Sequence, residues 1–272
     1  MKLGIILNRT IEGTDAAVNR LHNAADKLGI EVLDACSVET PDFFLVLGGD
    51  GSVLRAVHSV GGSRVPLVNI NIGSLGYLTC AGLDELDSVL SCLVDATYLI
   101  SERSMLKAEA FNPSGGSIAP PAYALNEAVV SRPDAGRIAG LDLCVDGENV
   151  TAFFCDGLIV ATPTGSTAYS LSAGGPIVMP EAQVLIINTI CPHTLSSRPL
   201  VLPDSSEIVL RVSRAYSPLN LSIDGQITAT LSVGDTVKIS NANRKVRLVM
   251  LPDRSPFETL RRKINWSGTL LK

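Results

Sequence analysis

Charged and aromatic side chains are scarce in this sequence of 272 residues. Charged residues make up 18% and aromatic residues 4%, whereas hydrophobic residues make up 46%. The mean hydropathy of +0.30 excludes a disordered chain, because such chains lack the apolar surface that offsets the entropy lost on ordering. We therefore expect a folded protein with a large core, arranged as two modest domains rather than one large domain.

Long hydrophobic runs and an excess of positive charge are also missing. No apolar run approaches the roughly 18–20 residues that a membrane-spanning helix needs. The formal net charge of −5 argues against a partner with a strongly negative surface. We therefore expect no membrane and no nucleic-acid partner, although a local basic cluster remains able to hold a small phosphate. The apolar start, Met1 to Leu7, is shorter than the core of a signal peptide and predicts a buried strand.

The sequence has few histidines and no cysteine motif. The six cysteines form no CxxC pair, so we expect neither a zinc site nor a disulfide framework, but reduced core residues of a cytoplasmic protein. None of the three histidines, His22, His58 and His193, lies beside a GxSxG elbow or in an HExxH motif. Nucleophilic catalysis of the hydrolase type is therefore not expected, and all three histidines are interpreted as exposed or structural.

Two different patterns divide the sequence near residue 100. Before it, apolar strand-like runs alternate with amphipathic stretches, which predicts βα units and a parallel sheet. The strand-like runs are 3–7, 31–33, 43–47 and 66–70, and the amphipathic stretches are 15–28 and 52–60. After it, turn residues alone separate the runs, which predicts a mostly antiparallel β domain. These later runs are 104–111, 122–131, 141–145, 152–161, 184–190, 208–212, 220–223 and 237–239.

The expected fold class is therefore an α/β domain at 1–100 followed by an all-β domain at 101–251. The tail, 252–272, has a helix-capping residue followed by charged and apolar residues between Ser255 and Ile264. This pattern predicts a short helix that returns to the first domain.

A glycine cluster around one acid, Gly48 to Ser52, follows the apolar run 43–47. Glycines let the backbone approach a ligand, and a helix N-terminus presents unpaired N–H groups to anionic oxygen. The cluster therefore predicts a phosphate cradle. Asp50 repels phosphate and is better suited to a hydroxyl group, or to a metal ion that accompanies phosphate. A tight turn with Asp50 as a helix cap remains the alternative interpretation.

Two further polar segments adjoin apolar runs. Asn71 to Tyr77 follows the run 66–70, at the sheet edge where open α/β folds bind ligands. Tyr77 is suited either to stacking on a base or to packing in the core. The pair Asn126-Glu127 lies inside the run 122–131, where an amide and an acid need polar partners. Ribose hydroxyls and an ordinary buried network would both satisfy this pair.

The segment from Cys155 to Pro176 is the most informative part of the sequence. An apolar strand opens into a dense set of glycines, hydroxyl side chains and one tyrosine. Small residues permit close backbone approach, and the hydroxyl groups offer several hydrogen bonds to a nucleoside. A helix start capped by a hydroxyl would explain only one of these side chains. We therefore favour ligand binding over a plain loop for this segment.

Taken together, the motifs resemble those of the NAD kinase family, in the same order and over nearly the whole chain. They are GGDG at 48–51, NxGxLGY at 71–77, NE at 126–127, DGLxxxTPxGSTAYxxSxGG from 156, CPHxLxxRP at 191–199 and DGQ at 224–226. The resemblance implies a Rossmann-like first domain, a β-sandwich-like second domain and an active site in the cleft between them. It also implies transfer of a phosphoryl group from ATP or inorganic polyphosphate to the adenosine ribose 2′-hydroxyl of NAD, giving NADP. Family members form a homodimer or homotetramer in which a neighbouring subunit completes the NAD site.

The resemblance further implies roles for individual residues. Asp50 would be the base for the 2′-hydroxyl, and Mg²⁺ would accompany the phosphate donor. The loop implied to hold the donor comprises Gly48, Gly49, Gly51 and Ser52. The residues implied to bind the dinucleotide are Asp50, Gly51, Arg55, Tyr77, Asn126, Glu127, Arg137, Asp156, Thr164, Thr167, Ala168, Tyr169, Ser170, Leu171, Ser172 and Gln226. Of these, Asn126 and Glu127 would hold the adenosine part, whereas the basic residues vary within the family.

Two other functions stay open at this point. A GGDG-type kinase that phosphorylates another alcohol, such as a sugar or a lipid, would share the phosphate cradle, but the DGLxxxTPxGSTAY stretch argues against it. A catalytically silent NAD-binding module is the second alternative, and the presence of Asp50 argues against that one.

Overall fold

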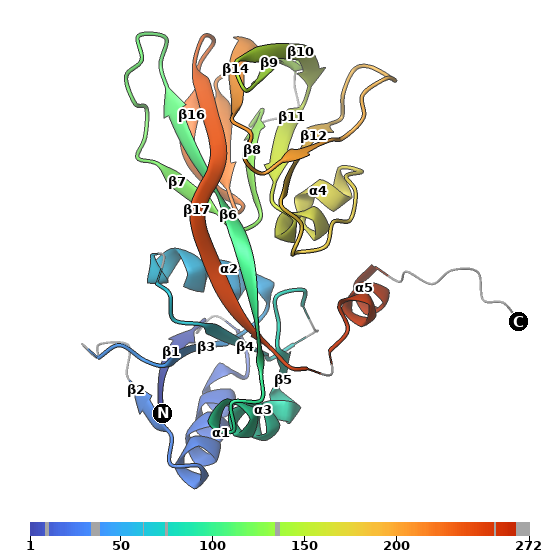
Figure 1. The fold of residues 1–272 in the computed structure, drawn as a ribbon. Helices are drawn as coiled ribbons and strands as arrows, with labels where there is room; N and C mark the ends of the chain where they lie inside the picture. The colour runs from blue at the N-terminus through green and yellow to red at the C-terminus, as the bar shows by residue number, and fades with distance from the viewer. Residues whose placement is uncertain are drawn as a thin grey trace, which may run out of the picture. The chain divides into compact units, whose positions relative to one another are not determined.

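The computed structural model describes residues 1–8, 11–33, 39–61, 63–73, 76–133, 137–252 and 254–264. It divides into two compact units, drawn in Figure 1. Unit 1 contains Met1–Glu102 and Val246–Lys272, and unit 2 contains Arg103–Lys245. Within the described ranges, no helix is long and apolar enough to cross a membrane.

Unit 1 is built on a parallel sheet with strand order β4-β3-β1-β2, as the alternating pattern predicts. Its strands are β1 (Lys2–Leu7), β2 (Glu31–Leu33), β3 (Phe43–Leu47), β4 (Leu67–Asn71) and β5 (Ala81–Gly82). Its helices are α1 (Thr14–Lys27), α2 (Asp50–Val60), η1 (Leu83–Glu85), α3 (Leu86–Val94) and α5 (Pro256–Ile264). The tail helix α5 thus forms where its sequence predicts a helix.

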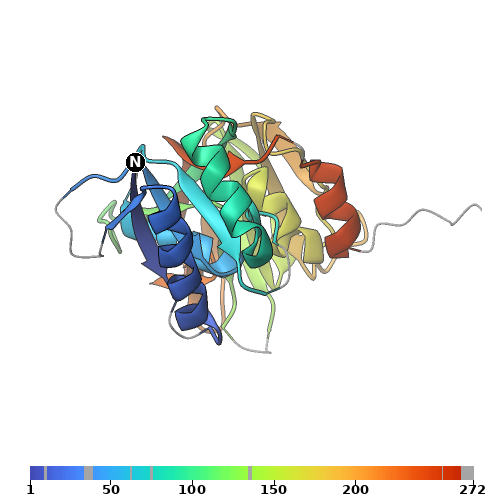
Figure 2. The same cartoon turned by 90° about the horizontal axis from the view of Figure 1, so that it is seen from below.

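The helices cover both faces of this sheet. Figures 1 and 2 show α1 and α3 on one face and α2 on the other. Ala17, Leu21 and Ala24 recur at helical spacing along α1, and all three are buried against the sheet. Both faces of β3 and β4 are therefore covered, which explains why these strands are continuous apolar runs rather than alternating ones.

Unit 2 is a β-rich fold around one large apolar cluster. One sheet is antiparallel, with strand order β13-β12-β11-β8-β15-β16. Its strands are β8 (Glu127–Ser131), β11 (Gly157–Ala161), β12 (Val184–Ile190), β13 (Leu200–Pro203), β15 (Leu219–Ile223) and β16 (Gln226–Leu231). The other strands of this unit are β7 (Ala122–Ala124), β9 (Ala139–Val145), β10 (Glu148–Cys155) and β14 (Ile208–Arg214), together with most of β6 (Leu99–Phe111) and β17 (Thr236–Met250), which continue into unit 1. The predicted combination of an α/β part and a mostly antiparallel β part is confirmed.

Two of the predicted strands are wrong as single elements. The run 122–131 forms β7 and β8, and the run 152–161 forms the end of β10 and the whole of β11. In both cases the second piece joins a different sheet from the first. Apolar residues continue through each break because both sheets bury their inner faces in the same core.

The five cysteines that the structure describes are free thiols, but only two of them are buried in the core, where the sequence analysis expects them. Cys80 and Cys155 are buried, Cys191 is exposed, and the remaining two are half-buried. Cys36 lies outside the described residues.

Candidate functional site

In unit 1, the glycine cluster connects β3 to α2, as the sequence predicts. Gly49 is the extended residue before the helix, and Asp50 begins its first turn. Ser52 is buried and its N–H donates to the Gly49 carbonyl at 2.8 Å. Within the described chain, the N–H groups of Asp50 and Gly51 have no protein acceptor, so they remain available to an anion at this helix terminus.

The Asp50 carboxylate binds the loop that follows β4. Its Oδ2 accepts a hydrogen bond from the Tyr77 N–H and its Oδ1 accepts one from the Leu78 N–H, both at 3.0 Å. A Cβ at Gly76 would lie 1.9 Å from Asp50 Oδ1, so this close approach requires glycine. The structure therefore brings the GGDG and NxGxLGY motifs together inside unit 1.

Tyr77 and Arg55 complete the predicted residues of unit 1. The Tyr77 hydroxyl oxygen is buried and has no hydrogen-bond partner among the described residues. Burial, and secondarily the Asp50 carboxylate, raises the pKa of the Tyr77 phenol. A buried hydroxyl without a partner costs free energy, which a polar ligand group would recover. Arg55 lies exposed on α2 and makes no ion pair with a described residue.

In unit 2, the NE pair and the TPxGST segment form one buried network. Thr162 Oγ1 donates to the Leu125 carbonyl at 2.6 Å and accepts the Gly165 N–H at 3.0 Å. The Thr162 N–H donates to the Asn126 carbonyl at 2.8 Å. A Cβ at Gly165 would lie 2.1 Å from that same carbonyl oxygen, so glycine is required for this approach. Two segments that are more than thirty residues apart are thus held in direct contact.

Glu127 is the titratable centre of this network. Its side chain is 6% exposed, and its Oε2 has no partner among the described residues. Burial, followed by the nearby Asp224 carboxylate, raises the pKa of Glu127 to about 7, while the Tyr169 backbone N–H acts in the opposite direction. The Glu127 carboxyl group is therefore suited to form a hydrogen bond with a ligand, or to transfer its proton to one, near neutral pH.

The residues from Thr164 to Ser172 form the short helices η2 (Thr164–Thr167) and α4 (Tyr169–Ser172) next to Glu127. Tyr169 and Ser172 are exposed, and Thr167, Ala168 and Leu171 are half-buried. Thr164 and Ser170 are buried, and Ser170 Oγ has no partner within the described part of the chain. The buried amide of Asn188 donates to the carbonyl oxygens of Ser170 at 3.1 Å and Ala173 at 3.0 Å. Motif reasoning did not single out Asn188, because an amide within an apolar strand gives no local signal.

Asp224 is the second residue that motif reasoning missed. Its carboxylate accepts the N–H groups of Leu125 at 2.8 Å, Asn126 at 2.8 Å and Glu127 at 3.2 Å. Asp224 is part of the DGQ motif, but within that motif the resemblance implies dinucleotide binding for Gln226 and no role for Asp224. Gln226 is exposed at the start of β16, next to the turn that carries Asp224.

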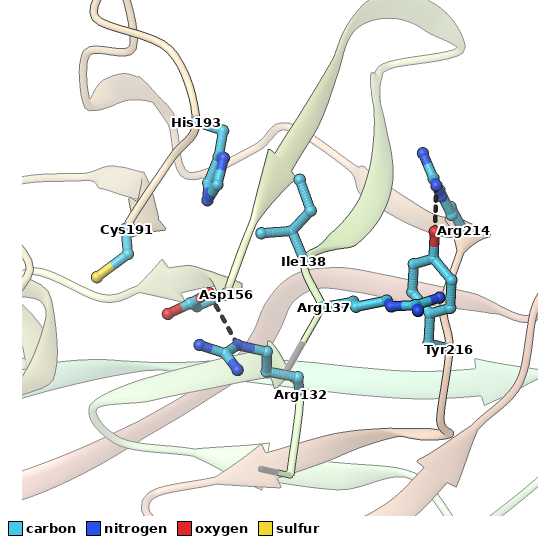
Figure 3. A pocket seen from close by; sticks show the side chains of 8 residues that line it. All are labelled: Arg132, Arg137, Ile138, Asp156, Cys191, His193, Arg214 and Tyr216. Atoms are coloured by element: carbon cyan, nitrogen blue, oxygen red, sulfur yellow. Dashed lines mark hydrogen bonds and ion pairs between the residues drawn. The ribbon is translucent and has the colours of Figure 1, made fainter. Parts of the chain in front are cut away.

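Asp156 and Arg137 do not lie with the other predicted residues of unit 2. In the pairing of β8 with β11, Glu127 faces Ala161, whereas Gly157 faces Ser131 at the opposite end. Asp156 precedes Gly157, so it lies about 16 Å of strand length away from Glu127. Figure 3 shows Asp156 and Arg137 there, with Arg132, Cys191, His193, Arg214 and Tyr216 around the same hollow.

Comparison with known proteins identifies the family. The model of the ATP-NAD kinase N-terminal domain matches residues 4–98, and the model of the C-terminal domain matches residues 125–251. NAD kinase from Geobacter metallireducens is 41% identical over 225 residues, which cover 83% of this chain and 79% of that protein. NAD kinase from Gemmatimonas aurantiaca is 34% identical over 281 residues, which cover 98% of this chain and 97% of that protein.

Solved structures show the same fold. The yeast NADH kinase complexed with NADH has a TM-score of 0.87 and 26% sequence identity, covering 100% of this chain and 90% of that one. An NAD kinase from Archaeoglobus fulgidus in complex with ATP has a TM-score of 0.80 and 27% sequence identity, covering 98% of this chain and 100% of that one. Both family models together span most of the sequence, and the relatives extend over nearly all of it. The chain therefore belongs to the NAD kinase family.

Proposed function

We propose that this protein is an NAD kinase that transfers a phosphoryl group from ATP or inorganic polyphosphate to the adenosine ribose 2′-hydroxyl of NAD. Membership of the family, through models for both of its domains, is the observation that carries the proposal. The bound molecules named for the related structures, NADH in one and ATP in the other, support an adenine dinucleotide as acceptor and ATP as donor.

In this proposal Asp50 accepts the proton of the 2′-hydroxyl. The hydroxyl oxygen forms the new bond to the transferred phosphorus, the bond between that phosphorus and the bridging oxygen breaks, and the shortened donor leaves. Phosphoryl transfer depends mainly on positioning and on charge stabilisation, so the chain has little covalent work to do. The N–H groups of the first turn of α2 are placed to bind donor phosphate.

The acids of this chain fit a magnesium ion that arrives with the donor. Among the residues described, no cluster of three or more His, Cys, Asp or Glu side chains is arranged to hold a metal ion. Mg²⁺ is usually bound by substrate phosphates with only one or two protein carboxylates, and Asp50 at the phosphate-binding turn suits that arrangement. When bound, the ion would neutralise part of the phosphate charge.

We propose that unit 2 binds the dinucleotide through the network around Glu127. Asn126 and Glu127 hold the adenosine part, and the segment from Thr164 to Ser172 surrounds it. Two unsatisfied polar atoms of unit 2 support this assignment, Glu127 Oε2 and Ser170 Oγ. We also propose a homodimer or homotetramer, which light scattering coupled to size-exclusion chromatography tests by measuring mass.

The proposal is tested by turnover of purified protein with NAD and Mg²⁺, offering ATP or polyphosphate in parallel and detecting NADP with an NADP-specific dehydrogenase. Asp50→Asn should lower kcat by roughly 10²–10⁴-fold, the usual contribution of a general base, with little change in NAD affinity. Asp15→Asn is the control, because the exposed Asp15, like the half-buried Asp50, lies in the first turn of a helix of unit 1. Binding of NAD without formation of NADP from either donor would instead identify a silent NAD-binding module.

A further inference from the structure

One polar side chain, Asn188, lies on an otherwise apolar face of β12 in unit 2. Ile186, Asn188 and Ile190 alternate along this strand, so their side chains share one face of the antiparallel sheet. Ile186 belongs to a small buried apolar cluster, against which Ile190 packs. Asn188 lies opposite Ile159 on the neighbouring strand β11 and is 3% exposed. An amide in such surroundings costs free energy unless its polar atoms are paired.

The Asn188 amide is paired with the backbone of α4. Its Nδ2 donates to the carbonyl oxygens of Ser170 at 3.1 Å and Ala173 at 3.0 Å. Carbonyls at the end of a helix lack partners within the helix, so they need donors from elsewhere. Among the described residues, no other group donates to the Ala173 carbonyl. One side chain of β12 therefore holds the end of α4 against the sheet (Figure 1).

The turn that follows α4 is closely packed around the same amide. The Gly175 N–H donates to the Ser170 carbonyl at 2.8 Å. A Cβ at Gly175 would lie 2.4 Å from Ser170 Oγ and 3.2 Å from Asn188 Nδ2, so this approach requires glycine. Any displacement of the Asn188 side chain is therefore felt directly by the backbone of this turn.

The first residue of α4 contacts the carboxyl group of Glu127. The backbone N–H of Tyr169 donates a hydrogen bond to this carboxyl group and favours its charged form. Burial and the neighbouring Asp224 carboxylate act in the opposite direction and raise the pKa of Glu127. Because α4 has only four residues and Ser170 follows Tyr169 directly, the two ends of the helix do not move independently. Holding the carbonyl groups of α4 therefore also holds the Tyr169 N–H at Glu127.

We propose that Asn188 is a positioning residue for dinucleotide binding, which acts through α4 on Tyr169 and Glu127. The inference rests on the proposed function, in which unit 2 binds the dinucleotide and the segment from Thr164 to Ser172 surrounds the adenosine part. The Asn188 amide donates to two backbone carbonyls, so it contributes by placing α4. When the binding-competent arrangement is populated only in part, the apparent affinity falls by that fraction.

Asn188→Leu tests the proposal, because leucine has the same branching as asparagine and suits the apolar face but donates no hydrogen bond. In calorimetric titration of the full chain with NAD, the dissociation constant should rise roughly tenfold, a loss that two neutral hydrogen bonds can supply. The amides of Ala173 and Gly175 should exchange faster with solvent. Asn188→Ser provides the same test if leucine prevents folding, which circular dichroism reports.

A pH series separates positioning from a general loss of stability. If α4 moves, the Tyr169 N–H no longer favours the charged form of Glu127, so the pKa of this carboxyl group should rise further. The midpoint of the pH dependence of NAD binding should therefore be higher in Asn188→Leu than in the unmodified protein.

Thr189→Val is the matched control. It removes a hydrogen bond between Thr189 Oγ1 and Ser197 Oγ, at 2.9 Å, from the other face of the same strand. This control should change neither the dissociation constant nor the midpoint. The proposal is overturned if Asn188→Leu leaves the affinity or the midpoint unchanged, or if Thr189→Val changes both equally. Absence of NAD binding by the unmodified protein would instead overturn the proposed function, and amide exchange at Ala173 and Gly175 would still decide whether Asn188 holds α4.

Discussion

Replacing Asp224 with alanine should destabilise unit 2 more than any other single change in a hairpin turn of this protein. Asp224 and Gly225 are the two turn residues between β15 and β16, with φ values of 47° and 78°. The Asp224 carboxylate accepts three backbone N–H groups, from Leu125, Asn126 and Glu127, at 2.8, 2.8 and 3.2 Å. The substitution leaves all three donors without this acceptor at the point where β7 gives way to β8.

The magnitude follows from the number and kind of these bonds. A hydrogen bond to a charged group contributes about 1.5–3 kcal/mol, but three that share one half-buried carboxylate contribute less than their sum. Alanine at a positive φ adds about 1 kcal/mol of backbone strain. We therefore expect the free energy of unfolding to fall by about 3–5 kcal/mol, a large part of the 5–15 kcal/mol typical of folded proteins.

Asp146→Ala provides the matched control. Asp146 and Gly147 form the turn between β9 and β10 with φ values of 51° and 83°, so the strain on introducing alanine is the same. The exposed Asp146 carboxylate accepts one backbone N–H, from Glu207, at 2.8 Å. The control should therefore lose about 1–2 kcal/mol, mostly from strain.

Urea denaturation of both variants and of the unmodified protein at one common pH measures the difference in the free energy of unfolding. Hydrogen exchange gives a local measure, because the amides of Leu125, Asn126 and Glu127 should exchange faster in Asp224→Ala alone. If both variants lose equal stability and these amides keep their protection, the reasoning is refuted.

Two further changes test the same network. The pKa of Glu127 is raised from 4.5 to about 7 in the folded protein, so between these pH values the folded protein binds more protons than the unfolded chain. The free energy of unfolding should therefore fall as the pH rises from about 4.5 to 7. Glu127→Gln should flatten that slope, and urea midpoints across this pH range measure it; an unchanged slope would mean that Glu127 titrates normally. Gly165→Ala places a Cβ 2.1 Å from the Asn126 carbonyl oxygen and should weaken NAD binding by roughly tenfold or more, which calorimetry measures. Gly174→Ala is its control for NAD affinity, because a Cβ at Gly174 meets no atom within 4 Å and adds only the backbone strain of a φ of 83°.

The sequence predicts the α/β half well because its signals are local. The continuous apolar runs of β3 and β4 and the helical spacing along α1 each arise from burial within one element. The β half is less accessible to this reasoning. At Asn126 the chain passes from one sheet to another without a glycine or proline. At Asp156 the following Gly157 is a turn signal, but it does not show that the chain changes sheets there. Both breaks depend on acceptors and donors distant in sequence. A pattern of period two does not contain that information.

The same limit applies to the candidate site. The hydroxyl and glycine residues from Thr164 to Ser172 are visible in the sequence because their density is unusual. The residues that hold this segment in place, such as Asn188, are single polar side chains in apolar strands and are visible only once the strands are paired. Asp156 adjoins the dense segment in sequence, yet strand β11 carries the rest of the segment to the opposite end of the sheet.

Asp50 shows why a motif acid can have two roles at once. A carboxylate has more lone pairs than the two that accept the Tyr77 and Leu78 N–H groups, so Asp50 can anchor this loop and still accept a proton from substrate. Loss of turnover in Asp50→Asn therefore does not by itself separate catalysis from anchoring. Gly76→Ala does, because its Cβ would lie 1.9 Å from Asp50 Oδ1 and displaces the carboxylate from the loop without removing it. If Asp50 is the base, Asp50→Asn should lower kcat far more than Gly76→Ala does. Gly76→Ala should in turn speed amide exchange at Leu78 more than Asp50→Asn does. Equal losses of kcat in the two variants would assign Asp50 to anchoring.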